Sequence, residues 1–270
     1  MPHFPPGEAE SLSRWLLEEL FSKNWIGLLS IKKEDVSRSH LDKMNSWIGE
    51  LEQGRPWQYI TGHAAFFGYD FLVNEAVLIP RQETEELVDL LIRHEKKRGE
   101  ISILDLGTGS GCIAISLARK LEDARVSACD ISVDALEVAS GNAGRLSAPV
   151  LFFEADMLRP AQIPGTYDVL VSNPPYIAEH ESAGMEERVT GHEPHTALFV
   201  PDEDPLRFYQ AIATLARTKL NPGGAVYVEI NERFGKETAA CFSAAGFSEV
   251  TLILDMQNKD RLIRATSLSL

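Results

Sequence analysis

The residues best suited to chemistry are Asn173-Pro174-Pro175-Tyr176, which follow the apolar run 167–172. Prolines have a fixed φ and no backbone N–H, so they leave carbonyl oxygens facing outward without competing donors. The Asn173 side chain adds an amide oxygen, which is a further acceptor, and Tyr176 adds a flat aromatic face. Two acceptors can hold both hydrogens of a planar –NH2 group and leave its nitrogen open to an electrophile. The tetrapeptide therefore predicts a site for an amide or amino nitrogen.

A glycine-rich turn upstream indicates where an electrophile would bind. The apolar run 101–105 leads into the turn Gly107-Thr108-Gly109-Ser110-Gly111, and a helix is expected over Cys112–Lys120. Glycines let the backbone approach a ligand closely, and a helix start offers unpaired N–H groups. Nineteen residues after Gly111, Asp130 ends a second strand-like run, where a carboxylate can accept ribose hydroxyls. This spacing predicts a nucleoside-containing cofactor.

The two motifs together resemble a class I S-adenosylmethionine-dependent methyltransferase that acts on a planar nitrogen. More closely, the chain resembles the HemK-type protein-(glutamine-N5) methyltransferases, which modify peptide chain release factors. Further matching segments, in order and at similar spacing, are Gln58–Gly62, Phe66–Gly68, Val77–Arg81, Thr84-Glu85, Glu193-Pro194, Ala197-Leu198 and Asp260-Arg261. The resemblance thus covers most of the chain.

The resemblance implies a role for each matching site residue, with S-adenosylmethionine as cofactor and S-adenosylhomocysteine as product. Gly107, Thr108, Gly109, Ser110 and Gly111 would surround the methionine moiety, Asp130 the ribose, and Asp156 and Met157 the adenine, with Asn173 at the methyl group. Asn173 Oδ1 and the Pro174 carbonyl would accept the two hydrogens of the substrate amide. Tyr176 would pack beside the glutamine side chain, next to Pro175. Release factors carrying a Gly-Gly-Gln motif are the implied partners.

The chain departs from the family pattern at a few positions. Met157 stands where the family often has an aromatic residue, Gln82 where proline is common, and Asn231 where glycine is usual. A polarisable thioether can replace aromatic packing. None of the three lies in the glycine turn or the Asn-Pro-Pro-Tyr segment, so activity is still expected.

Residue patterns predict three parts of the chain. Apolar residues at helical spacing over residues 9–21 and 41–51 favour a small helical bundle over 1–62, a candidate for docking the protein substrate. Aromatic and β-branched residues over 63–80, with a turn candidate at 73–76, suggest a β-hairpin linker. Residues 81–270 are expected to form the methyltransferase domain.

In that domain, strand-like and helix-like segments alternate. Strands are expected near 101–105, 125–129, 150–154, 167–172 and 225–230, and helices over 83–97, from Ser132 to about Arg145, and from Asp204-Pro205 to near Leu220. Such alternation predicts an α/β fold with a mostly parallel sheet and helices on both faces. Ligands bind such sheets at the carboxyl ends of the strands. The family topology implies that the strands before Gly107 and Asn173 are neighbours.

The composition of the chain indicates which kinds of binding partner to expect. The net charge of −14 does not favour DNA or RNA, whose binding depends on Lys and Arg. No apolar stretch is long enough to span a membrane, and residues 1–8 lack the pattern of a secretory signal. Cys112, Cys129 and Cys241 fit reduced thiols of a cytoplasmic protein. No spacing of histidines indicates a metal site.

Three other functions fit parts of the pattern. The same glutamine chemistry could act on a ribosomal protein. An Asn-Pro-Pro-Tyr site serves the amino group of adenine equally well, although flipping a base out of a duplex needs a phosphate-binding surface that this acidic chain lacks. A silent S-adenosylmethionine-binding assembly factor is a non-enzymatic reading, against which the intact acceptor pair argues.

Overall fold

The computed structural model describes residues 6–185 and 187–267, so the ends of the predicted first and last domains, at 1–5 and 268–270, lie outside the described residues. The chain divides into two compact units. Of the described residues, the helical unit comprises 6–63 and 187–192, and the sheet unit comprises 64–185 and 193–267. The hairpin region that follows residue 63 is thus part of the sheet unit.

The helical unit is built on amphipathic helices. Its elements are α1 (Pro6–Phe21), α2 (Trp25–Leu28), η1 (Lys33–Asp35), α3 (Arg38–Glu52), α4 (Trp57–Thr61) and α8 (Glu187–Thr190). Leu16, Trp47 and Leu51 form a small buried cluster. The Ser37 side chain accepts from the His40 backbone N–H and so caps the start of α3.

The predicted hairpin forms, but its turn lies elsewhere than expected. Strands β1 (His63–Phe66) and β2 (Tyr69–Leu72) are joined by Phe67 and Gly68, which both have positive φ, +50° and +79°. A two-residue turn of this handedness matches the twist of the strands. The turn candidate at 73–76 was therefore wrong as the hairpin turn, since it follows β2.

The sheet unit contains a sheet of seven strands that is mostly parallel. The parallel arrangement was predicted, and the sheet has two strands more than the five expected. The strand order is β10-β11-β9-β6-β3-β4-β5, and the strands are β3 (Ile101–Leu106), β4 (Ala124–Asp130), β5 (Val150–Glu154), β6 (Tyr167–Ser172), β9 (Leu220–Glu229), β10 (Glu249–Leu254) and β11 (Asp260–Thr266). Strands β9, β6, β3, β4 and β5 are parallel, and β11 and β10 add an antiparallel edge. The expected pairing of β3 with β6 is present.

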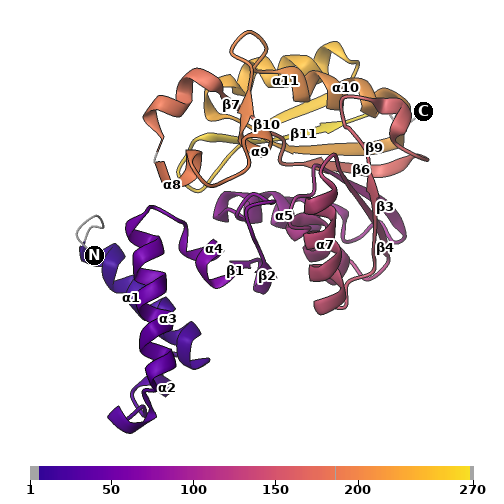
Figure 1. Cartoon of the computed structure of the whole chain (residues 1–270). Coiled ribbons are helices and arrows are strands. Elements are labelled where there is room, and N and C mark those ends of the chain that lie inside the picture. Colours follow the sequence, from indigo (N-terminus) through magenta and orange to yellow (C-terminus); the bar gives the residue numbers. More distant parts are fainter. Residues whose placement is uncertain (1–5, 186, 268–270) are drawn as a thin grey trace. The chain divides into compact units, whose positions relative to one another are not determined.

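Alternate residues of β3 point to opposite faces of the sheet. Both faces are therefore apolar, and helices cover both. Ile103 belongs to one core cluster, and Leu104 belongs to the other. Helices α5 (Gln82–Glu95), α6 (Cys112–Lys120) and α7 (Val133–Arg145) pack on the first face, and α10 (Arg207–Lys219) and α11 (Gly235–Ala244) pack on the second (Figure 1). This three-layer arrangement confirms the α/β fold.

Shorter elements complete the unit. They are η2 (Pro160–Gln162), β7 (Ile177–Ala178), η3 (Glu179–Gly184), α9 (His195–Leu198), β8 (Phe199–Val200) and η4 (Glu232–Phe234), and β7 pairs with β8 in parallel. Strand β9 begins at Leu220, five residues before the predicted start, because Leu220 pairs with Tyr167. Among the described residues, no helix is long and apolar enough to cross a membrane.

Candidate active site

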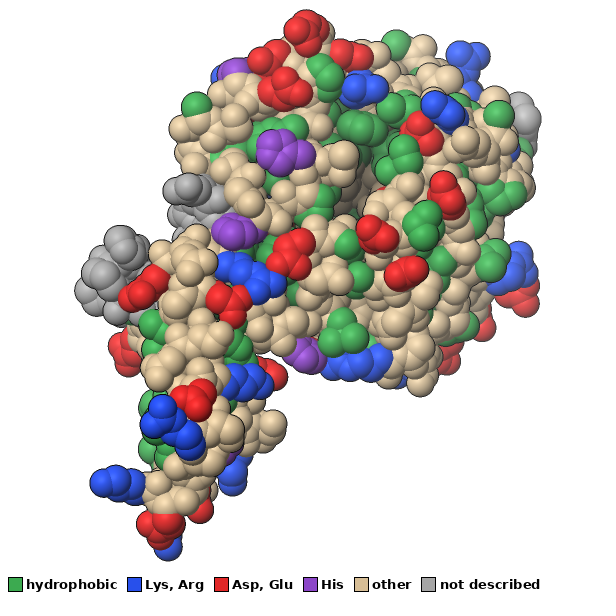
Figure 2. Space-filling model, viewed as in Figure 1, with side chains coloured by type: hydrophobic (Ala, Val, Ile, Leu, Met, Phe, Trp, Pro, Cys, Tyr) green, Lys and Arg blue, Asp and Glu red, His purple; other side chains and the backbone are tan. Residues whose placement is uncertain are grey.

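A cavity of about 480 Å³ opens in the sheet unit, beside the carboxyl ends of β3, β4 and β6. Figure 2 shows this unit hollowed between apolar side chains. The predicted site residues that line the cavity are Gly107, Thr108, Gly109, Ser110, Asp130, Asp156, Met157, Asn173 and Pro175. Segments far apart in the sequence therefore meet in one place. Its volume is within the usual range of small-molecule sites.

The shape of the glycine turn requires a glycine at position 107. The backbone N–H groups of Gly107 and Thr108 both donate to the Cys129 carbonyl, at 2.9 and 3.0 Å, which ties the turn to the end of β4. Gly107 has φ +72°, and a Cβ there would lie 2.8 Å from Met157 Cε. Because only glycine avoids both penalties, Met157 can pack directly against the turn.

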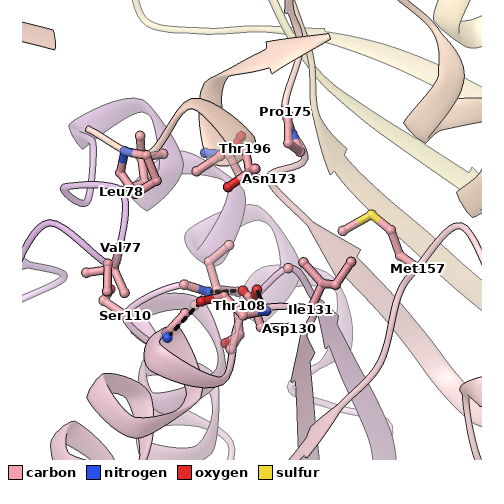
Figure 3. A pocket seen from close by; sticks show the side chains of 18 of the residues that line it. Val77, Leu78, Thr108, Ser110, Asp130, Ile131, Met157, Asn173, Pro175 and Thr196 are labelled. Carbon is pink, nitrogen blue, oxygen red and sulfur yellow. Dashed lines mark hydrogen bonds between the residues drawn. The ribbon is translucent and has the colours of Figure 1, made fainter. Parts of the chain in front are cut away.

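Asp130 closes the lower side of the cavity in Figure 3 and holds the glycine turn in place. Its two carboxylate oxygens accept from the backbone N–H groups of Gly109 and Ser132, each at 2.9 Å. Burial raises the pKa of Asp130, and those two N–H groups oppose the rise. A carboxylate has about four acceptor positions, so Asp130 can still accept from a hydroxyl donor in the cavity.

Asp105 lies beneath the turn, fully buried at the end of β3. Thr108 Oγ1 donates to its Oδ2 at 2.7 Å, while its Oδ1 makes no hydrogen bond with the described residues. Burial raises the pKa of Asp105 to about 7. The Asp105 carboxyl group, which lies under the glycine turn, therefore changes its protonation state near neutral pH.

At the opposite end of the cavity, Asn173 and Pro175 extend from the end of β6 (Figure 3). Asn173 Nδ2 donates to Thr84 Oγ1 at 3.0 Å, and Thr84 Oγ1 donates to Glu229 Oε2 at 2.7 Å. No described residue donates to Asn173 Oδ1, so this acceptor is available to a ligand. The second acceptor that the sequence predicts is the backbone carbonyl oxygen of Pro174.

Pro174 and Tyr176 are not among the residues that line the cavity. Pro174 is buried. The Tyr176 hydroxyl donates to Glu229 Oε1 at 3.1 Å, and burial raises the pKa of this phenol. The structure thus directs the Tyr176 hydroxyl to the end of β9, and the predicted contact of its ring with a substrate stays a prediction.

Residues of the linker, and of the loop that follows Glu193, form another wall of the cavity. The buried Glu193 carboxylate accepts from the Ile79 backbone N–H at 3.1 Å and pairs with Arg81. This pairing holds Leu78 and Thr196 in the wall that faces Asp130 and Met157 (Figure 3). The resemblance had singled out Arg81 and Glu193 without a role, and their contact supplies a structural one.

Two residues with important contacts were missed by the sequence reasoning. Glu229 ends the apolar strand β9 yet is buried, and Asn142 is buried on α7. A polar residue at the helical spacing of Ala135 and Ala139 is the signal that could have identified Asn142. No group of three or more His, Cys, Asp or Glu side chains among the described residues could hold a metal ion.

The fold and the cavity together define a class I methyltransferase. A solved methyltransferase from Pyrococcus furiosus shares the fold, with a TM-score of 0.55 and 18% identity over 76% of this chain and 91% of that chain. The 16S rRNA N2 G1207 methyltransferase of T. Thermophilus, solved with AdoMet and guanosine, also has a TM-score of 0.55, at 16% identity over 76% and 49% of the two chains. Family models match the methyltransferase small domain over residues 76–190 and the PrmC N-terminal domain over residues 6–62.

Curated relatives identify the family. The release factor glutamine methyltransferase of Bacteroides thetaiotaomicron is 43% identical over 97% of this chain and 94% of its own. That of Flavobacterium psychrophilum is 39% identical over 97% and 93%, and that of Lactococcus lactis is 39% identical over 92% and 89%. The chain belongs to the release factor glutamine methyltransferases.

Proposed function

We propose that this enzyme transfers the methyl group of S-adenosylmethionine to the side-chain amide nitrogen of the glutamine in the Gly-Gly-Gln motif of peptide chain release factors. The observation that carries the proposal is the position of Asn173. It directly follows β6, which pairs with the strand that leads into the glycine turn, and presents an acceptor oxygen to the cavity that the turn lines.

The residues present fit S-adenosylmethionine. Gly107 and Gly109 line the cavity and have positive φ, so the turn exposes backbone there, whereas Gly111 is not among the lining residues. Asp130 retains acceptor positions for ribose hydroxyls, and Met157 offers a polarisable apolar surface for adenine next to Asp156. When bound, the cofactor supplies an electrophilic methyl group on a positively charged sulfur.

The enzyme's main task is alignment, because an amide nitrogen is a weak nucleophile whose lone pair is delocalised. Asn173 Oδ1 and the Pro174 carbonyl accept the two amide hydrogens and turn the nitrogen toward the methyl group. Well-oriented reactants lower a barrier by roughly 7–11 kcal/mol. As the nitrogen gains positive charge, these two acceptors bind it more strongly, which stabilises the transition state more than the ground state.

The release factor is the proposed partner because the relatives are named for that activity. We also propose that residues 1–62 form a domain that docks the protein substrate, with 63–80 as linker and 81–270 as the catalytic domain. Acidic and apolar side chains border the hollow in Figure 2. The residues that line the cavity include Arg81 and Arg207 beside Asp130, Asp134 and Asp156, and the whole chain has a net charge of −14. This supports a protein substrate over a nucleic acid. Since release factors act in translation, we expect the reaction in the cytoplasm.

One assay tests the function. The purified protein and methyl-labelled S-adenosylmethionine are offered four substrates: a release factor with Gly-Gly-Gln, the same factor with that glutamine replaced by alanine, ribosomal protein, and DNA. We expect label only in the first. Label in ribosomal protein or DNA alone would assign a different substrate, and an unlabelled set would point to a silent binder.

A further inference from the structure

The side chain of Asn173 is one end of a hydrogen-bond chain that continues through Thr84, which also lines the cavity, to the buried Glu229. Its amide nitrogen donates to Thr84 Oγ1 at 3.0 Å. Thr84 Oγ1 donates in turn to Glu229 Oε2 at 2.7 Å. Thr84 and Glu229 are 2% and 1% exposed, so water does not compete for these bonds.

The direction of the chain follows from its buried end. Burial raises the pKa of Glu229, and the hydrogen bonds from Thr84 and Tyr176 and the charge of Arg261 oppose that rise. In its ionised form the carboxylate only accepts hydrogen bonds, so the Thr84 hydroxyl donates to Glu229. The hydroxyl oxygen then has only lone pairs to offer to Asn173, and the Asn173 group that faces it must be the –NH2 end. The amide oxygen is thereby turned toward the cavity.

Tyr176 holds the other side of the carboxylate. Its hydroxyl donates to Glu229 Oε1 at 3.1 Å, which leaves Oε2 to Thr84. Asn231, two residues after Glu229, donates from Nδ2 to the Tyr176 carbonyl at 3.1 Å. The end of β9 therefore braces both ends of the Asn-Pro-Pro-Tyr segment, and Glu229 has a fixed position.

We propose that Thr84 and Glu229 are positioning residues that set the orientation of the Asn173 amide and so make the site select a substrate –NH2 group against a carboxylate. The inference rests on the proposed function, because it assigns the selected group to the glutamine of a release factor. With its oxygen toward the cavity, Asn173 attracts the amide hydrogens of glutamine and repels the oxygens of glutamate. A reversed amide would do the opposite.

Thr84→Val tests the inference, because valine has nearly the shape of threonine but no hydroxyl. The Asn173 amide then has no partner that distinguishes its two ends. We expect turnover on the release factor to fall by about tenfold, the size of effect expected when one buried hydrogen bond is lost. The affinity for S-adenosylmethionine should change by less than about twofold, since Thr84 bonds to Asn173 and not to the glycine turn.

A binding measurement tests whether Asn173 presents an acceptor to the substrate. The affinity of the release factor is compared with that of the same factor carrying glutamate in place of its Gly-Gly-Gln glutamine. We expect the wild-type preference for glutamine to shrink by about tenfold in Thr84→Val, a change that general loosening of the fold would not produce. Thr84→Ser restores the hydroxyl and should recover most of the preference and turnover.

The chain offers a matched control at Thr238, a fully buried threonine on α11 whose hydroxyl makes no hydrogen bond with the described residues and which does not line the cavity. Thr238→Val should leave turnover and preference unchanged. If Thr84→Val fails to fold, Glu229→Gln carries the test. Its amide can donate to Thr84, which frees the Thr84 hydroxyl to donate to Asn173 Oδ1, and the preference should shrink again.

The outcomes separate this inference from the proposed function. If wild-type protein does not methylate the release factor, the function itself fails. If the wild type methylates the factor but a folded Thr84→Val or Glu229→Gln variant keeps the full preference for glutamine, the positioning role is overturned. A reduced preference that Thr84→Ser restores supports it.

Discussion

The side-chain nitrogen of Asn142 donates a hydrogen bond to the Ser110 backbone carbonyl at 2.9 Å. The same side chain forms two bonds with Leu72, accepting from its N–H at 2.7 Å and donating to its carbonyl at 2.9 Å. Asn142 lies on α7, Leu72 ends the linker hairpin, and Ser110 belongs to the glycine turn. One fully buried amide thus connects the hairpin to the cofactor turn.

Replacing Asn142 by alanine should weaken both the fold and the turn, because the Ser110 carbonyl would stay buried without this partner and the Leu72 backbone would lose two hydrogen bonds. We expect the free energy of unfolding to fall by about 3 kcal/mol, measured by urea denaturation. The affinity for S-adenosylmethionine, measured by calorimetry, should fall as well. Asn74→Ala is the control, since Asn74 is exposed and its side chain accepts from the Ala76 N–H of the neighbouring turn. Equal stability of the two variants would contradict the connecting role.

Gly107→Ala should damage cofactor binding beyond its effect on the backbone. Gly165→Ala is the matched variant, because Gly165 also has positive φ, +65°, but its added Cβ would meet nothing within 4 Å. Both should lose about 1–2 kcal/mol from the left-handed conformation. Only Gly107→Ala pushes against Met157, so only it should weaken binding of S-adenosylmethionine, by about tenfold or more. Calorimetric titrations that gave the two variants the same affinity would argue against this contact.

Asn173→Ala should separate turnover from cofactor binding. Removing the side-chain acceptor leaves the substrate amide held at one point, and we expect turnover to fall at least about tenfold. The dissociation constant of S-adenosylmethionine should stay near that of the wild type. Asn221→Ala, which removes a bond to Asp168 away from the cavity, serves as control. Near-normal turnover of Asn173→Ala would remove this residue from the mechanism.

Asp105 should make the stability of the fold depend on pH. Its pKa is raised by burial from 3.8 to about 7, so between these values the folded state binds more protons than the unfolded state. Stability is then greatest at low pH and falls as pH rises to about 7, by on the order of 4 kcal/mol. We expect Asp105→Asn to gain stability relative to wild type as the pH rises, so that the difference in unfolding free energy (variant minus wild type) is larger at pH 8 than at pH 5. Denaturation curves that shift equally in the two proteins would exclude this titration.

Much of the sheet could be predicted from the sequence, because its central strands are buried. Strands β3 and β6 are mostly apolar and are followed by recognisable turns, and they lie where the pattern indicated. The C-terminal hairpin was missed. Strand β10 is an edge strand with no fully buried residue, so its apolar and β-branched residues do not mark it as a strand of the buried core.

The amino-acid sequence by itself determined the two local motifs: a glycine turn that needs positive φ, and a proline-rich turn that presents acceptors. Both follow from the chemistry of neighbouring residues. Only the tertiary structure decided which way the Asn173 amide faces, because that depends on Thr84, 89 residues away, and on Glu229, 145 residues from Thr84. Hydrogen bonds are directional and short, so such partners become known only when the folded chain brings them within about 3 Å of each other.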